Sequence, residues 1–183
     1  MAPRGKAAAL ARAAGATQSR AVILDRDGVL NVDRGYVGER ERFEWMPGAG
    51  AAVRRWNEAG RLVIVATNQS GVARGYFDET AVAALHAAMS EDLARENARI
   101  DAFYACPFHP EATIAAYRHP DHPDRKPNPG MILRALTDFD LRPHEAVLIG
   151  DKESDLEAAR RAGVRGLLFP GGDLHAFAKA HGL

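Results

Sequence analysis

The stretch AVILDRDGVLN, Ala21 to Asn31, decides the fold, because an apolar run leads directly into two aspartates. A short apolar run rich in branched side chains and ended by charged residues is typical of a buried strand. Asp25 and Asp27 are two positions apart, so in extended backbone both side chains point to the same side. The stretch therefore predicts a buried strand with a pair of carboxylates at its carboxyl end.

Similar apolar runs recur along the chain and alternate with helical patterns. The expected strands are Ala21–Asp25, Arg61–Asn68, Ala102–Cys106, Ala146–Asp151 and Arg165–Phe169. The expected helices are Gly48–Ala59, Asp78–Ala98, Gly130–Phe139, Ser154–Ala162 and Asp173–Ala180. Strands that are apolar on both faces are typical of a parallel sheet covered by helices. The alternation predicts an α/β fold: a doubly wound, Rossmann-like, mostly parallel sheet with helices on both faces.

The composition of the 183 residues limits the class of protein. The 24 basic side chains equal the 24 acidic ones, so no net positive field draws the chain to nucleic acid or to an anionic membrane. One cysteine forms no internal disulfide, and no apolar run approaches the roughly 20 residues of a membrane span. We expect one domain over residues 21–183, working as a monomer in the cytoplasm. Residues 1–20 form an Ala/Arg-rich extension, interpreted as a tail rather than a transit peptide.

Polar residues follow three of the expected strands at the point where each strand ends. These segments are Asp25–Asp27, Thr67–Ser70 and Gly150–Lys152. In open α/β sheets, ligands bind beyond the carboxyl ends of the strands, where the strand order reverses. If these three strands are neighbours, their ends converge on one crevice. The residues expected to contact a substrate there are Thr67, Asn68, Gln69, Ser70 and Lys152.

The carboxylates at these strand ends indicate metal-dependent phosphoryl chemistry. Adjacent like charges need a cation, and Mg²⁺ prefers carboxylate oxygens. Asp25 and Asp27 can address one ion together, and Asp151 and, one helical turn later, Asp155 can supply the remaining oxygens. Asp25 is the expected nucleophile, which would form an aspartyl-phosphate, and Asp27 is the expected general acid and base. The groups expected to stabilise the transferring phosphoryl group are Thr67, Lys126 and nearby backbone N–H groups.

Four segments in this order resemble the motifs of the haloacid dehalogenase-like phosphatases: DRDGVLN from Asp25, then Thr67, Lys126 and GDKESD from Gly150. The segments LDRDGVLNVDRGYV, VATNQSGVARGYF, RKPNPGM and IGDKESDLEAA resemble one subgroup more closely. That subgroup contains D-glycero-D-manno-heptose 1,7-bisphosphate 7-phosphatases and histidinol-phosphate phosphatases. The resemblance implies Mg²⁺-dependent removal of the 7-phosphate of the heptose bisphosphate through an aspartyl-phosphate, on the route to ADP-heptose and the lipopolysaccharide core.

The resemblance also implies roles for individual residues. Mg²⁺ would be held by Asp25, the carbonyl oxygen of Asp27 and Asp151. Arg125 would contact the phosphate that is not cleaved, since its planar fork suits a phosphate. The substrate loop corresponds to Asp33, Arg34, Gly35 and Tyr36. A minimal cap made of loops, about residues 31–45 and 107–128, would shape an open pocket for a phosphorylated sugar.

The loop from Ala105 to Gly130 departs from the subgroup's pattern. Relatives carry a structural zinc on Cys-x-His and Cys-x-Cys directly before Arg-Lys-Pro, and here only the first ligand, Cys106, is unchanged. Phe108 replaces one ligand, and the second pair reads His122-Pro-Asp124. The residues that could form a rearranged set are Cys106, His109, His119 and His122. We expect no structural zinc, with the prolines stiffening the loop instead.

Other functions share part of this pattern. A histidinol-phosphate phosphatase and a broader small-phosphoester phosphatase would use the same catalytic motifs. A DNA 3′-end phosphatase would need a basic groove and stacking aromatics, whereas the chain is neutral and 7% aromatic. A sugar-phosphate binding module without activity would lack the nucleophile or the acid, and both Asp25 and Asp27 are present.

Three further side chains receive no role in the chemistry. Arg26 is expected to point away from the metal, because Asp25 and Asp27 on either side of it face the crevice. His86, on the long alanine-rich helix, is expected to be solvated or half-buried. Trp56 is expected to pack in the apolar core.

Overall fold

The computed structural model describes residues 20–183, so the expectation for the N-terminal extension lies outside the described residues except at Arg20. The strands are β1 (Ala21–Leu24), β2 (Leu62–Asn68), β3 (Ala102–Cys106), β4 (Ala146–Gly150) and β5 (Arg165–Leu168). They form one sheet in the order β3-β2-β1-β4-β5, and every pairing is parallel. The doubly wound parallel sheet is confirmed, and β1 lies between β2 and β4.

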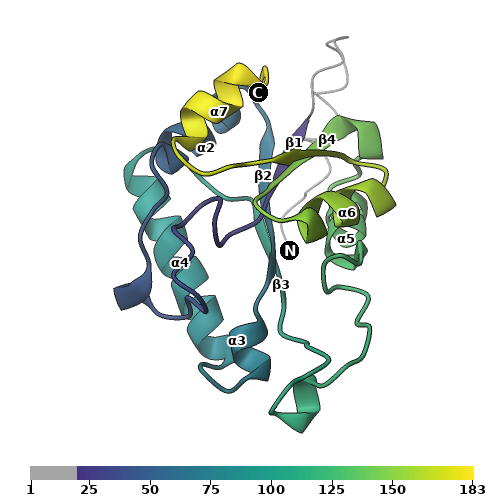
Figure 1. Ribbon diagram of the computed structural model, residues 1–183. Coiled ribbons are helices and arrows are strands. Elements are labelled where there is room, and N and C mark those ends of the chain that lie inside the picture. The colour runs from purple at the N-terminus through teal and green to yellow at the C-terminus, as the bar shows by residue number, and fades with distance from the viewer. Residues whose placement is uncertain (1–19) are drawn as a thin grey trace, which may run out of the picture.

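Helices cover both faces of the sheet (Figure 1). One face carries α2 (Ala49–Glu58), α4 (Glu79–Arg95) and α7 (Leu174–Ala180), and the other carries α5 (Gly130–Asp138) and α6 (Glu153–Arg161). A short helix that was not expected, α3 (Ser70–Ala73), follows β2 directly. The 3-10 turns are η2 (Arg40–Arg42), η3 (Ala115–Tyr117) and η4 (Pro143–Glu145).

The strands alternate between two apolar cores. In β1, Val22 and Leu24 pack toward α2 and α4, while Ala21 and Ile23 pack toward α5 and α6. All four side chains are fully buried, as the period of two in an extended strand requires when both faces are covered. The edge strands β3 and β5 are only partly buried, so the expectation of strands apolar on both faces holds for the central three.

Carboxylate side chains accept backbone N–H groups at the starts of two helices. The Asp78 carboxylate accepts the Ala81 N–H at 2.8 Å and caps α4. Helix α6 begins at Glu153, one residue before the expected start at Ser154. There the Asp155 carboxylate accepts the backbone N–H of Lys152 at 3.1 Å, which turns this side chain back toward the end of β4.

The loops expected to form the cap contain no strand or α-helix, only the turns η2 and η3 and isolated bridges such as Asn31 to Trp45 and His109 to Arg118. The minimal cap is therefore confirmed as an arrangement of loops beside the carboxyl edge of the sheet. Within residues 20–183, no helix is both long enough and apolar enough to cross a bilayer.

The central strand β4 provides a test of the core. Leu148 is fully buried, so Leu148→Ala should lower the free energy of unfolding by about 2–5 kcal/mol through lost transfer energy and the cavity left behind. Leu133 on α5 is 45% exposed, and Leu133→Ala should change the free energy of unfolding by less than about 0.5 kcal/mol. Urea denaturation followed by circular dichroism measures both. Equal losses for the two variants would contradict the assigned core.

Candidate active site

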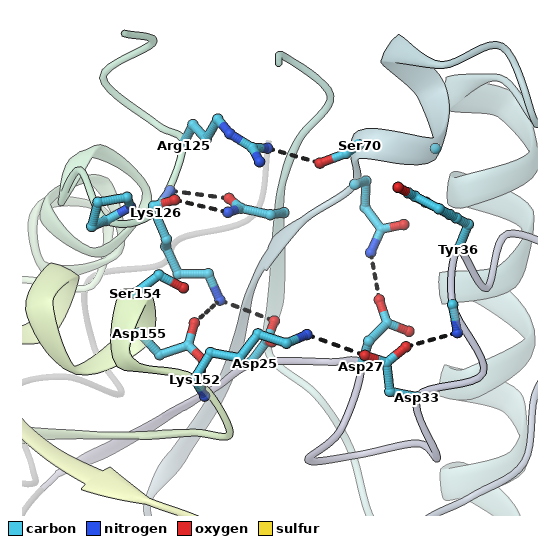
Figure 2. A pocket seen from close by; sticks show the side chains of 15 residues that line it. Asp25, Asp27, Asp33, Tyr36, Ser70, Arg125, Lys126, Lys152, Ser154 and Asp155 are labelled. Atoms are coloured by element: carbon cyan, nitrogen blue, oxygen red, sulfur yellow. Dashed lines mark hydrogen bonds and ion pairs between the residues drawn. The ribbon is translucent and has the colours of Figure 1, made fainter. Parts of the chain in front are cut away.

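The carboxyl ends of β1, β2 and β4 meet at a pocket of about 630 Å³ (Figure 2). Its walls combine these strand ends with the loop before α5, the loop after β1 and the first turn of α6. The lining residues are Asp25, Asp27, Asp33, Gly35, Tyr36, Asn68, Gln69, Ser70, Gly71, Arg125, Lys126, Pro127, Lys152, Ser154 and Asp155. Segments more than a hundred residues apart in the chain thus share one crevice.

A buried lysine forms the floor of the pocket. Lys126 is 3% exposed, and its Nζ lies 2.9 Å from Asp25 Oδ1 and 2.6 Å from Asp155 Oδ1. The same ammonium donates to the Ala66 carbonyl at 2.7 Å. Burial alone would lower the pKa of Lys126, but the two carboxylates outweigh burial and raise it, so the lysine stays charged.

The end of β2 holds this lysine in place. The Asn68 side chain donates to the Lys126 carbonyl at 3.0 Å and accepts the Lys126 N–H at 3.0 Å. Asn68 therefore pairs with the loop backbone as a neighbouring strand would. The sequence expectation placed Asn68 against the substrate, and the structure gives its amide this backbone contact as well.

Three carboxylates are arranged to hold a cation. One oxygen each from Asp25, Asp151 and Asp155 lies within 4.8 Å of the others. Among the described residues, Asp151 Oδ1 is buried and accepts no hydrogen bond, whereas Asp25 Oδ1 is held by the Lys126 ammonium at 2.9 Å. Burial, and then the charge of Asp25, raise the pKa of Asp151 to about 6. An all-oxygen set of this kind, with the buried Asp151 Oδ1 lacking a partner, fits Mg²⁺.

Gly28 lets the first loop approach this cluster closely. Its φ is +90°, and a Cβ there would lie 2.3 Å from Asp151 Oδ2. Both facts require glycine, since a side chain would be strained in this conformation and would displace the carboxylate. The glycine of DRDGVLN thus shapes the cation site without contributing a ligand.

Asp27 and Thr67 are linked by one amide. The Gln69 Nε2 group donates to Asp27 Oδ2 at 3.0 Å and to Thr67 Oγ1 at 2.9 Å. Asp27 lines the pocket, whereas Thr67 is buried directly behind it and is not among the lining residues. The structure therefore brings Gln69 between two of the residues predicted to act in the chemistry.

The loop after β1 closes one side of the pocket. Asp33 Oδ1 accepts the Gly35 N–H at 2.9 Å, and Asp33 Oδ2 pairs with Lys152 Nζ at 3.1 Å. Burial would raise the pKa of Asp33, but the Gly35 N–H and Lys152 hold it below its ordinary value. Tyr36 also lines the pocket. Arg34 is not brought into it, because its guanidinium pairs with Glu44 on the exposed side of the loop.

Arg125 occupies the opposite end of the pocket from the cation cluster (Figure 2). Its Nη1 donates to Ser70 Oγ at 2.8 Å and to the Phe108 carbonyl at 3.1 Å. Burial lowers the pKa of this guanidinium, as does the neighbouring Arg74, but an arginine remains charged. Lys126 and Arg125 thus place separate cationic groups at two ends of the pocket, carried on adjacent residues with side chains that diverge, and Lys152 adds a third cation to its wall.

Sequence reasoning missed several contributors. Ser154, Gly71 and Pro127 line the pocket, and Ser154 could have been found because it lies within GDKESD. His86 is buried at 9% exposure and stacks on Phe103, so the expectation of a solvated or half-buried side chain is wrong. Helical periodicity could not show this, because Phe103 belongs to the next element, β3, and its contact with α4 depends on how the two elements pack. Trp56 is fully buried in the core, as expected.

The cysteine and histidine loop is packed by aromatic rings. Phe108 stacks on His122 with ring centres 4.0 Å apart and planes 6° apart, and His119 meets His122 edge-on at 5.1 Å. Cys106 Sγ lies 3.9 Å from His122 Nδ1. Within residues 20–183, the grouping of metal-type ligand atoms is the Asp25, Asp151 and Asp155 cluster, and it does not extend to this loop.

Known proteins share this fold and sequence. The family model described as "HAD-hyrolase-like" matches residues 124–180. A D-glycero-beta-D-manno-heptose-1,7-bisphosphate 7-phosphatase of Rhodopseudomonas palustris is 48% identical over 167 residues, 91% of this chain and 92% of that protein. A D-glycero-alpha-D-manno-heptose-1,7-bisphosphate 7-phosphatase of Burkholderia mallei is 48% identical over 151 residues, 80% and 77% of the two chains.

A solved structure agrees with these relatives. The D,D-heptose 1,7-bisphosphate phosphatase of B. bronchiseptica, complexed with magnesium and phosphate, matches with a TM-score of 0.74 and 34% identity, over 90% of this chain and 88% of that one. Fold and carboxylate site together define a haloacid dehalogenase-like hydrolase. Within that class, the chain belongs to the family of the heptose-1,7-bisphosphate 7-phosphatases.

The buried ion pairs of Lys126 lead to a stability prediction. Lys126→Met should lower the free energy of unfolding by about 3–5 kcal/mol, because Asp25 and Asp155 then lose their buried counter-charge. Lys152→Met is the matched control: its side chain is 54% exposed, and loss of its pair with Asp33 should cost less than about 1 kcal/mol. Chemical denaturation in metal-free buffer measures both. A Lys126→Met variant as stable as the Lys152→Met variant would refute this assignment.

Proposed function

We propose that this protein is an Mg²⁺-dependent phosphatase that removes the 7-phosphate of D-glycero-D-manno-heptose 1,7-bisphosphate. The observation that carries the proposal is the pocket with a carboxylate pair and Lys126 at one end and Arg125 at the other. Such a pocket suits an elongated substrate with a phosphate at each end. Relatives at 48% identity carry the names of both anomeric forms, so the proposal covers the bisphosphate without choosing the anomer.

In the first step, a carboxylate oxygen of Asp25 attacks the phosphorus of the 7-phosphate. The bond from phosphorus to the sugar oxygen breaks, and that oxygen takes a proton from the Asp27 carboxyl group. The product is an aspartyl-phosphate on Asp25 and a free sugar hydroxyl. Lys126, 2.9 Å from Asp25, balances the negative charge on the phosphoryl oxygens during the transfer.

In the second step, a water molecule attacks the phosphorus of the aspartyl-phosphate. Asp27, now ionised, takes a proton from this water. The bond between phosphorus and the Asp25 oxygen breaks, which releases inorganic phosphate and restores both carboxyl groups to their starting states. One side chain therefore serves as acid and then as base.

Asp25, the Asp27 carbonyl oxygen and Asp151 are the groups that would hold Mg²⁺. The buried Asp151 Oδ1, which accepts no hydrogen bond, supports this assignment. Asp155 is the weaker candidate, because both of its oxygens are engaged, one by Lys126 and the other by the Lys152 N–H, whereas Lys126 engages one oxygen of Asp25. When bound, the cation supplies positive charge that offsets the repulsion between Asp25 and an incoming phosphate.

The second phosphate and the sugar would be held by the remaining walls. The planar guanidinium of Arg125, fixed by Ser70 and the Phe108 carbonyl, can bind a phosphate through two parallel N–H donors. Asp33, Tyr36 and Lys152 face the space between the two phosphate sites and offer partners for sugar hydroxyls. The substrate is thus bound by both ends, with one end at the reacting carboxylate.

We further propose that residues 21–183 act as one domain and work as a monomer. One sheet supports both apolar cores, which supports a single domain. The single, buried cysteine suits a reducing compartment such as the cytoplasm.

A phosphate-release screen tests the substrate. Purified protein with Mg²⁺ should release one phosphate from α- or β-heptose 1,7-bisphosphate with at least about tenfold higher kcat/KM than from histidinol phosphate or fructose 1,6-bisphosphate, because both phosphate sites are then filled correctly. Removal of Mg²⁺ by EDTA should abolish turnover, and added Mg²⁺ should restore it. Faster release from histidinol phosphate would instead make that the substrate.

Asp25→Asn serves as the catalytic control in this screen. It should abolish turnover, because an amide does not attack phosphorus, while circular dichroism and phosphate binding stay close to those of the unchanged protein. Retained turnover would remove Asp25 as the nucleophile.

We also propose that the Cys106 to Asp124 loop is held without zinc. The stack of Phe108 on His122 and the edge contact of His119 hold parts of the loop together, and Phe108 stands where a ligand would be needed. Metal analysis of protein purified without chelators should find less than about 0.1 equivalent of zinc, since a structural site needs four converging ligands. About one equivalent, lost together with stability on chelation, would overturn the proposal.

A further inference from the structure

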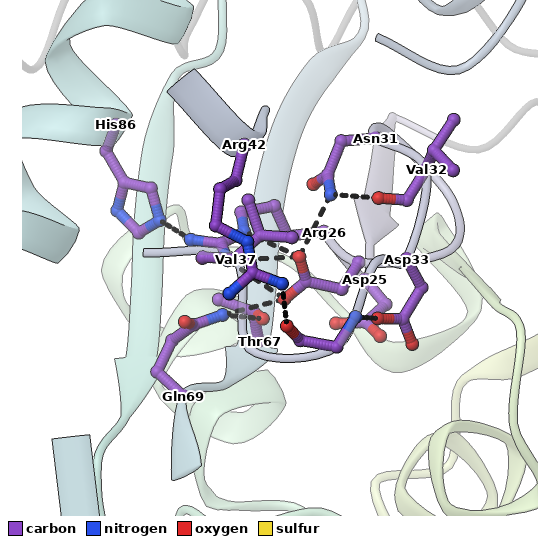
Figure 3. A network of polar contacts seen from close by, with 12 residues as sticks. Asp25, Arg26, Asn31, Val32, Asp33, Val37, Arg42, Thr67, Gln69 and His86 are labelled. Carbon is purple, nitrogen blue, oxygen red and sulfur yellow. Dashed lines mark hydrogen bonds and ion pairs between the residues drawn. The ribbon is translucent and has the colours of Figure 1, made fainter. Parts of the chain in front are cut away.

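We propose that Arg26 is a positioning residue that sets the orientation of the acid and base Asp27; the inference rests on the proposed phosphatase function. Arg26 was expected to point away from the crevice, and its side chain does leave on the side of α4. It is fully buried there, and its guanidinium then curves back to the Asp27 carboxylate (Figure 3). The residue between the two catalytic aspartates is thus bound to one of them.

The contact has the geometry of a fork on a carboxylate. Arg26 Nη2 lies 2.9 Å from Asp27 Oδ2 and 3.0 Å from Oδ1, and Nε lies 3.4 Å from Oδ1. Both oxygens are therefore engaged by one planar group, which fixes the rotation of the carboxylate as well as its position. A single ammonium at the same place would fix the distance to the Asp27 carboxylate but leave the carboxylate free to rotate.

The guanidinium is itself held from behind. Nη2 also donates to the Val37 carbonyl, and Nη1 lies 3.4 Å from His86 Nε2. Burial, and then the charge of Arg26, lower the pKa of His86 to about 3, so the ring is neutral and can accept this contact. His86 is in turn fixed by stacking on Phe103 with ring centres 4.3 Å apart. Arg26 is thus anchored to the sheet and to α4.

Two neutral amides complete the set around Asp27. Asn31 Nδ2 donates to Oδ1 at 3.0 Å, and Gln69 Nε2 donates to Oδ2 at 3.0 Å. An ionised carboxylate has about four lone-pair directions, so these donors occupy the available ones in the state of Asp27 that takes a proton from water. Hydrogen bonds from a charged donor are roughly twice as strong as those from neutral donors. Arg26 is therefore the dominant constraint, and the amides are the contacts that can yield when Asp27 exchanges a proton with the substrate.

A purely structural role does not account for this arrangement. A buried ion pair can often be replaced by apolar side chains of similar volume without loss of stability. The position instead holds a fully buried cation aimed at the one carboxylate that must transfer protons. The geometry points to a catalytic reason for the charge.

The test is the kinetics of p-nitrophenyl phosphate hydrolysis by Arg26→Lys, which keeps the charge but loses the fork. This leaving group departs without a proton, so the first step proceeds without Asp27, whereas attack by water on the aspartyl-phosphate still needs it. Rapid mixing should show an intact burst of p-nitrophenolate followed by a steady rate lowered about 10- to 100-fold, within the range that acid and base groups contribute. Asp27→Asn should show the same pattern more strongly.

Two variants separate positioning from stability. Arg61→Lys is the matched control, because Arg61 is also an arginine with only 3% exposure but lies before β2, at the other end of the sheet. It should leave both phases unchanged. His86→Phe keeps the stacked ring but removes the acceptor for Arg26, and it should lower the steady rate by roughly 2- to 10-fold, the value of one modest hydrogen bond.

The burst amplitude counts folded active sites, so a merely destabilised variant would lose amplitude while keeping the ratio of the two phases. That result for Arg26→Lys, or an unchanged steady rate beside a slow Asp27→Asn, would overturn the role of Arg26. An Asp27→Asn variant with full turnover would overturn the acid and base assignment and the Arg26 role with it. Failure to cleave heptose bisphosphate, with the p-nitrophenyl phosphate pattern intact, would overturn only the proposed substrate.

Discussion

The repulsion among carboxylates at one edge of the sheet is the constraint on which the rest of this site depends. Asp25 and Asp27 follow β1, while Asp151 and Asp155 follow β4. The parallel pairing of these strands clusters Asp25 with Asp151 and Asp155, and Asp27 lines the same pocket. Like charges this close are stable only with nearby cations. The chain supplies one for each group: Lys126 between Asp25 and Asp155, Arg26 on Asp27, and Lys152 beside Asp151 and Asp33. The Asp151 Oδ1 atom, buried and without a hydrogen-bond donor, is what remains for a metal.

The chemistry of each cation matches its position. Lys126 presents a compact ammonium that fits between two carboxylates and a carbonyl, and its burial keeps these interactions strong. Arg26 presents a rigid fork, suited to fixing the rotation of a single carboxylate. Lys152 is half exposed, so its pair with Asp33 is weaker and can open when a substrate needs either group. Rigidity therefore increases from the mouth of the pocket toward the reacting groups.

Much of this arrangement could be predicted from the sequence, because strand ends carry local signals. The apolar run before Asp25 and the run before Thr67 identify strands, and parallel strands end at the same edge. That rule alone places Asp27, Asn68 and Gln69 at the pocket. It does not place Arg34, which belongs to a loop whose direction depends on a turn. The Arg34 guanidinium lies outside the pocket and pairs with Glu44. Helix α6 starts one residue earlier than expected. Its first turn is fixed by the Asp155 carboxylate, which accepts the Lys152 N–H, and the capping preference of Ser154 does not reveal that contact.

Arg26 shows that the alternation of side chains along a strand does not by itself predict the contacts of a long side chain. A period of two correctly places its Cβ on the face opposite Asp25 and Asp27, and for a short side chain that would exclude any contact with the pocket. An arginine is long enough to leave on one face and return to the next residue on the other. Whether it returns depends on what blocks its outward path, here His86 on α4, backed by Phe103 on β3. Those residues lie about sixty and eighty positions further along the chain, so the direction of Arg26 is a property of the packed sheet and not of the motif that contains it.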